Sequence, residues 1–211
     1  MAQAATARPA RSGPTMLADI VNIASPSTAP HTIRFSAALT ATFSAQYRAS
    51  FPGGKAKEQG GTIVADQAGN LSIQRLGGLR STNQDIDFDM RPTDPARFQA
   101  IGMFHTHAYD ASDGSEVGIP FSGGDFGTVI NDKYFISIVQ SGTYLFVCLK
   151  TAATPKAVNM MALHAAVNAH VAKSQANGMS FGDASRSVVL KVARMLNFAY
   201  YIGANGMATQ V

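Results

Sequence analysis

The sequence IGMFHTH, residues 101–107, decides the expected fold. Four apolar or small residues lead into two histidines, a pattern typical of a strand that runs into the core. Alternate residues of a strand point to the same face, so His105 and His107 can reach a single point. Two neutral imidazoles side by side are half of the four ligands that zinc prefers. The segment therefore predicts a buried strand with a candidate metal pair at its end.

The segments on either side of this strand predict a mixed α/β (α+β) fold. Helical spacing of apolar residues indicates helices, and alternating or continuous short apolar runs indicate strands. We expect a helix at 32–50, strands at 62–65 and 71–76 joined through Gly69, a half-buried strand at 85–90, a helical turn at 96–100, a helix beginning near Ser122, a hairpin of 134–140 and 143–150 through Gly142, and helices at 156–177 and 182–201. These elements predict a mixed central sheet flanked by helices, in one domain.

The order of these elements divides the 211 residues into three parts. Residues 1–30 are rich in Ala, Ser, Thr and Pro and bury little, so we expect a flexible N-terminal tail and linker. Residues 31–155 contain all the predicted strands. Residues 156–211 contain the two C-terminal helices, which we expect to pack on the same domain.

Composition and charge exclude several classes of protein. Charged residues make up 14%, and Lys plus Arg minus Asp plus Glu is 17 − 13 = +4, with no basic run. This distribution predicts no nucleic-acid partner. The single cysteine excludes an intramolecular disulfide, and no apolar run approaches the ~20 residues of a membrane span. No continuous apolar stretch follows Arg8 and Arg11, so we expect no classical signal peptide, and a protein that is cytoplasmic or exported by a signal-independent route.

Asp125, in the sequence SGGD at 122–125, is the third candidate metal ligand. If a helix begins here, residues three apart share a face, and Ser122 and Asp125 point together towards the strand end. A carboxylate would complete a His₂Asp set with one position open for water, which is typical of catalytic zinc. Taken alone, Ser122 is also typical of a helix N-cap, and Asp125 of an acidic first helical turn.

Glu58 precedes Gly60, Gly61 and the strand at 62–65. The two glycines allow other backbone to come close. A glutamate before a strand is by itself typical of a protein surface. Its meaning therefore depends on the other candidate residues.

Taken together, these residues resemble the motif set of the JAMM (MPN-type) zinc metallopeptidases. That family has a Glu at the start of a strand after the first helix, then His-x-His at a strand end, then Ser-x-x-Asp at the start of a helix. Glu58, His105-Thr106-His107 and Ser122-Gly-Gly-Asp125 occur in that order, and the resemblance covers about residues 32–150. The chain departs from the family in Thr106 and Ala108, where Ser and Pro are common. It also has a longer insertion, 108–121, which we expect to be a substrate loop or lid.

The resemblance implies a function and a role for each residue. It implies one zinc ion per chain, held by His105, His107 and Asp125, with Glu58 as general base for an activated water and Ser122 as hydrogen-bond donor to the oxyanion. Residues 31–155 would then be a JAMM-like domain that hydrolyses a peptide or isopeptide (amide) bond. The implied substrate is a peptide, an isopeptide-linked protein or a cell-wall peptide, with a protein partner allowed and with no nucleic acid or membrane.

Two alternatives stay open at this point. A non-catalytic MPN-like protein-interaction module would keep the fold, but we would expect it to have lost at least one of the five polar residues. An exported bacterial amidase that acts on cell-wall peptides would be a special case of the hydrolase. Cys148 lies in an apolar strand and is typical of a buried structural thiol, which argues against a cysteine peptidase.

Overall fold

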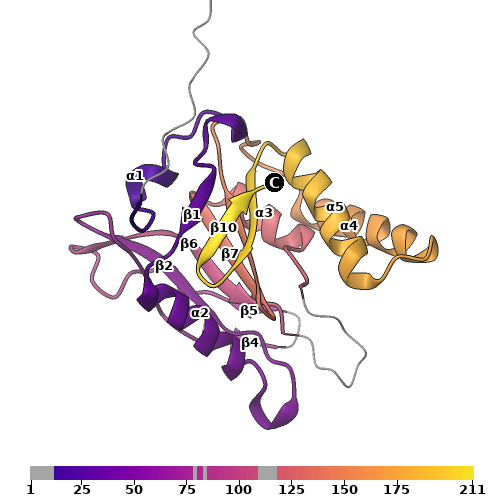
Figure 1. Cartoon of the computed structure of the whole chain (residues 1–211), viewed down its shortest axis with the longest axis horizontal. Coiled ribbons are helices and arrows are strands. Elements are labelled where there is room, and N and C mark those ends of the chain that lie inside the picture. The colour runs from indigo at the N-terminus through magenta and orange to yellow at the C-terminus, as the bar shows by residue number, and fades with distance from the viewer. Residues whose placement is uncertain (1–11, 78–79, 83–84, 109–117) are drawn as a thin grey trace, which may run out of the picture.

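A curled sheet runs through the molecule (Figure 1). The computed structural model describes residues 12–77, 80–82, 85–108 and 118–211. Within them the sheet has eight strands in the order β1-β10-β9-β8-β7-β6-β2-β3. The strands are β1 (Thr32–Arg34), β2 (Gly60–Asp66), β3 (Leu71–Gln74), β6 (Phe98–Thr106), β7 (Ile136–Ser141), β8 (Tyr144–Leu149), β9 (Ala199–Ala204) and β10 (Met207–Gln210). A separate short pair consists of β4 (Arg80–Ser81) and β5 (Ile86–Asp87).

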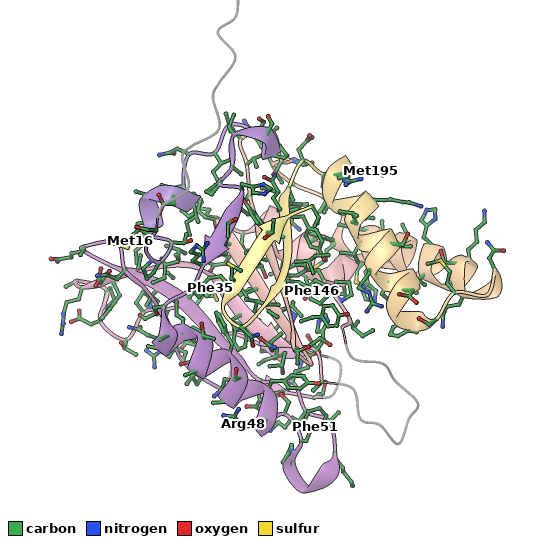
Figure 2. All side chains as sticks on the ribbon, viewed as in Figure 1. Met16, Phe35, Arg48, Phe51, Phe146 and Met195 are labelled. Atoms are coloured by element: carbon green, nitrogen blue, oxygen red, sulfur yellow. The ribbon has the colours of Figure 1, made fainter. Side chains whose placement is uncertain are left out.

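Helices cover both faces of the sheet, as the mixed α/β prediction requires. The helices are α1 (Leu17–Ile20), α2 (Ala37–Ala49), α3 (Gly123–Asn131), α4 (Met160–Ala176) and α5 (Phe181–Met195), with short 3₁₀ turns at Pro26–Thr28 and Pro52–Gly54. Phe35 belongs to the core between the sheet and α1 and α2, and Phe146 to the core between the sheet and α3 and α5 (Figure 2). Helix α4 packs on α3 and α5. The result is a single domain with a mixed sheet between helical layers.

One parallel strand pair, β6 and β7, brings the polar groups of the candidate site together. β6 and β7 are parallel, whereas the other neighbouring strands of the sheet are antiparallel. Parallel neighbours need a crossover connection, and α3 lies in this one. The end of β6 and the beginning of α3 are both in the connection from β6 to β7, and each carries candidate ligands.

The helix predicted at 32–50 begins later than expected. Residues Thr32–Arg34 form β1, which pairs with β10, and α2 starts only after its N-cap, Ser36. The residues predicted as a flexible tail and linker also differ in part from expectation. Ile20 and Ile23 are buried in the core beside α2, so residues 16–30 are structured, while residues 1–11 lie outside the described part of the chain.

The predicted helix at 182–201 is too long. Helix α5 ends at Met195, and Asn197 adopts a positive φ of 55°, which ends the helix. The next residues form a hairpin, β9 and β10, through Asn205 and Gly206, whose φ values of 51° and 75° are both positive. The part 156–211 is therefore two helices and a hairpin that completes the sheet.

Two smaller predictions are also corrected. The helical turn expected at 96–100 is replaced from Phe98 onwards by β6, and only Ile86–Asp87 of the strand expected at 85–90 is a strand. The hairpins through Gly69 and Gly142 and the helix after Ser122 are confirmed. Among the described residues, no helix has both the length and the apolar character that crossing a membrane would need.

Candidate metal centre

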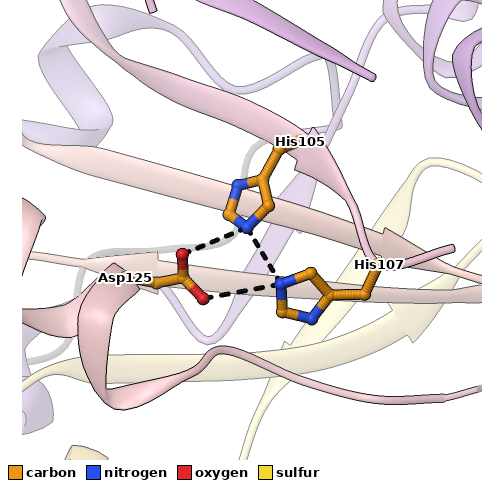
Figure 3. Close-up of side chains that lie close together, drawn as sticks. All are labelled: His105, His107 and Asp125. Carbon is orange, nitrogen blue, oxygen red and sulfur yellow. Dashed lines mark hydrogen bonds and ion pairs between the residues drawn. The ribbon is translucent and has the colours of Figure 1, made fainter. Parts of the chain in front are cut away.

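Three side chains meet where β6 ends and α3 begins (Figure 3). The Nε2 atoms of His105 and His107 lie 3.1 Å apart. His105 Nε2 is 3.2 Å from Oδ1 of Asp125, and His107 Nε2 is 3.5 Å from Oδ2 of the same carboxylate. His105 and His107 are only 2% and 7% exposed. The predicted ligand set is thus brought to one point, and this group could hold a metal ion.

The spacing of these atoms fits a tetrahedral ion. Bonds of about 2.0–2.1 Å in a tetrahedron separate the ligand atoms by roughly 3.3–3.4 Å. The three separations of 3.1, 3.2 and 3.5 Å lie on both sides of that range. Two imidazoles and one carboxylate are also the donor types that zinc takes in catalytic sites, where a fourth position stays open. The donor set and its spacing therefore suit a zinc-like cation.

One hydrogen bond fixes which nitrogen of His107 faces the cluster. Its Nδ1 lies 3.2 Å from the carbonyl oxygen of Ile119. A carbonyl only accepts, so Nδ1 carries a proton and Nε2 is the atom available to a metal. His105 is held differently, because its buried Nδ1 has no hydrogen-bond partner among the described residues.

The charged groups of the cluster shift one another's pKa values. Burial lowers the pKa of His107, but the hydrogen bond and charge of Asp125 and the charge of Glu58 outweigh it and raise the pKa to about 9. Burial raises the pKa of Asp125, yet the two imidazoles hold that pKa well below its usual range. A protonated His107 can donate from Nε2 to the neighbouring ligands, so without a metal one proton occupies the place between them.

Glu58 lies beside the three ligands without being one of them. Its Oε1 is 4.0 Å from Nε2 of His107, and the residue is 6% exposed. Burial raises the pKa of Glu58, which His107 and His105 oppose and Asp125 adds to. A buried carboxylate with a raised pKa next to a metal group is suited to accept a proton near neutral pH. Glu58 is therefore buried, and is not the surface residue that a glutamate before a strand usually is.

Ser122 is the N-cap of α3, and it is bonded to Asp125 in both directions. Its Oγ accepts from the backbone N–H of Asp125 at 3.1 Å, and its own backbone N–H donates to Asp125 Oδ2 at 2.6 Å. This capping box fixes the Asp125 carboxylate at the helix start. Because Oγ acts as acceptor here, its hydroxyl proton is left for another partner.

Thr106, between the two histidines, connects the site to the opposite face of the sheet. Its Oγ1 accepts from the backbone N–H of Gln59 at 2.9 Å and lies 2.7 Å from Oγ of Ser50, which is 3.0 Å from the carbonyl of Gln46. Since each hydroxyl has one proton, the bonds run from Gln59 through Thr106 and Ser50 to Gln46. The chain next to Glu58 is therefore tied to the end of α2.

Sequence reasoning missed the residues that support the site through hydrogen bonds to or from the backbone, such as Ser50 and Ile119. Nothing in residue type or spacing distinguishes a buried serine or an isoleucine carbonyl of this kind. Residues 109–117 of the predicted loop 108–121 lie outside the described residues. Cys148 is fully buried, and burial raises its thiol pKa well above the usual value, as expected of a structural thiol.

Comparison with known proteins does not place the chain in a family. No family model, no curated protein and no solved structure matches it.

Proposed function

We propose that this protein is a zinc-dependent hydrolase of the JAMM type that cleaves a peptide or isopeptide bond. The observation that carries this proposal is that His105, His107 and Asp125 converge beside a buried carboxylate. Oε1 of Glu58 lies 4.0 Å from Nε2 of His107. A zinc ion at the three ligands would supply the Lewis acidity that moves the pKa of a bound water from about 15.7 towards 7.

In this proposal, the chain's own residues move the protons. Glu58 accepts the proton of the attacking water and passes it to the leaving amine. Ser122 donates a hydrogen bond from its hydroxyl to the oxygen of the amide carbonyl as negative charge develops there. The substrate is an amide in a peptide, an isopeptide-linked protein or a cell-wall peptide.

The test begins with elemental analysis of wild type and His107→Ala, both purified without added metal. We expect about one zinc per chain in the wild type and none in the variant. Wild-type protein that holds no metal after zinc is offered at neutral pH would refute the proposal. The result would then favour the non-catalytic interaction module.

A panel of unmodified peptides, isopeptide-linked lysine peptides and peptidoglycan fragments, with products read by mass spectrometry, then tests the chemistry. We expect Glu58→Gln to retain zinc and to lose cleavage. Asp87→Asn, which removes an exposed carboxylate outside the site, is the control and should cleave as the wild type does. Zinc-loaded Glu58→Gln with wild-type activity would exclude Glu58 as the base.

A further inference from the structure

Ser141, the last residue of β7, holds the chain where it returns from the insertion to the metal centre. Its Oγ accepts from two consecutive backbone amides, those of Gly118 and Ile119, at 3.0 and 3.1 Å. Ser141 is fully buried. Two donors on one buried hydroxyl oxygen fix the backbone of Gly118 and Ile119 in position and orientation.

The next peptide group, between Ile119 and Pro120, faces the candidate metal centre. The carbonyl of Ile119 accepts from Nδ1 of His107. This bond keeps a proton on Nδ1, so Nε2 is the atom that faces His105 and Asp125 and that would bind a metal ion. Ser141 is thus separated from a candidate metal ligand by one residue of backbone.

Helix α5 holds the preceding residue from the opposite direction. Arg186 Nη1 donates to the carbonyl of Gly118 at 2.9 Å, while its Nη2 is paired with Asp183 at 2.7 Å and its guanidinium lies over the ring of Tyr144. Gly118 has a φ of +82°, and a Cβ there would lie 2.7 Å from Nη1 of Arg186. The positive φ favours glycine here, and a Cβ would crowd Arg186. Ser141 and Arg186 hold this segment through separate backbone groups of Gly118.

We propose that Ser141 is a positioning residue for the metal ligand His107, acting through the backbone of Ile119, with Arg186 of α5 in a supporting role. This inference rests on the proposed metal centre. Outer hydrogen bonds of this kind fix the tautomer and ring orientation of a ligating histidine, and removing one typically weakens metal binding about 10–100-fold.

A second serine in the same strand makes a matched control. Ser137 is also fully buried in β7, but its Oγ has no hydrogen-bond partner among the described residues. Ser141→Ala and Ser137→Ala therefore remove the same atom from the same strand. Only the first removes the acceptor of the Gly118 and Ile119 amides.

The experiment measures zinc affinity by competition with a chromophoric chelator, together with the visible spectrum of the Co²⁺-loaded protein. We expect Ser141→Ala to weaken zinc binding by about 10–100-fold and to alter the Co²⁺ spectrum. Ser137→Ala should match the wild type in both. Arg186→Gln, a change at a partly exposed side chain, should weaken zinc binding in the same direction and serves if Ser141→Ala does not fold.

Imidazole nitrogen NMR of the zinc-loaded protein gives a readout that lost stability alone would not change. The wild type should show His107 protonated at Nδ1, with this signal altered in Ser141→Ala. Wild-type zinc affinity and NMR signals in both Ser141→Ala and Arg186→Gln would overturn the inference. Absence of zinc binding in the wild type itself would instead overturn the metal centre, so the two failures are distinguishable.

Discussion

Gly60 shows how closely β2 must approach β6 beside the metal centre. It pairs with His105, and a Cβ at this position would lie 2.4 Å from the carbonyl oxygen of Phe104 and 3.1 Å from Cβ of His105. Backbone cannot give way as a flexible side chain can. The residue type is therefore fixed by the approach of the strand that carries the ligands.

We predict that Gly60→Ala destabilises the protein by about 1–3 kcal/mol, as overpacking of a core usually does. The displacement reaches a metal ligand, so zinc affinity should fall too. Urea unfolding and chelator competition measure the two effects. Gly13→Ala is the control, because a Cβ at Gly13 meets nothing within 4 Å. Equal stability of the two variants would show that the strands separate without cost.

The candidate ligands were predictable at the scale of single residues because their signal is local. His105 and His107 share a strand face by spacing alone, and Ser122 and Asp125 share a helix start. Ser141 carries no such signal, since its partners are backbone amides more than twenty residues earlier in the chain. The groups that hold the candidate ligands in place could therefore not be predicted from the sequence.

At the scale of the element, α3 depends on the same serine that the proposed chemistry uses. Ser122 caps α3 through the Asp125 amide, and Ser36 caps α2 through the Leu39 amide at 3.3 Å. Each serine accepts a hydrogen bond from the backbone amide three residues later and so caps its helix. They differ in that only Ser122 stands beside a ligand of the metal centre.

We predict that Ser122→Ala and Ser36→Ala each lower stability by about 1 kcal/mol, the usual cost of a lost N-cap. Only Ser122→Ala should also lower the rate of amide cleavage, by about 10²–10³-fold, as the loss of an oxyanion donor does. Thermal unfolding and the cleavage assay separate the two roles. If both variants cleave alike after correction for the folded fraction, Ser122 is a cap alone.

The elements that sequence patterns misplaced are those at the margins of longer ones. The helix expected at 182–201 ran on because apolar residues continue after Met195, although Asn197 can end a helix in the left-handed region. Asn205-Gly206 is a strong hairpin signal that identifies β9 and β10. Thr32–Arg34 is too short to show a period, and its pairing with β10 lies far away in the sequence.

At the scale of the whole molecule, both ends of the described chain contribute to the sheet that holds the site. β1 and β10 pair at one edge, and β9 lies between β10 and β8. Helix α5 reaches from the C-terminal part to Gly118. We therefore expect the stability of the fold and the state of the candidate metal centre to be linked.

This linkage predicts how metal-free protein responds to pH. The pKa of His107 is raised from 6.5 to about 9 in the folded state, so the folded state binds its proton more tightly than the unfolded state does. That contribution to stability is fully present below pH 6.5 and is lost as the pH rises through 9. We expect chelator-treated protein to lose stability between these values, on the order of a few kcal/mol at about 1.4 kcal/mol for each unit of pKa shift.

Zinc should reverse this trend, because the ion needs the deprotonated imidazole and displaces the same proton. Urea unfolding at pH 6, 7, 8 and 9 measures the free energy of unfolding. In the metal-free protein it should fall as the pH rises, and the gain in stability that zinc gives should grow as the pH rises. In the variant His107→Asn, neither the fall of stability with pH nor the effect of zinc on it should remain. His170→Asn, a change at an exposed residue of α4, should behave as the wild type does. Parallel curves with and without zinc would mean that the ion does not bind where the proton does.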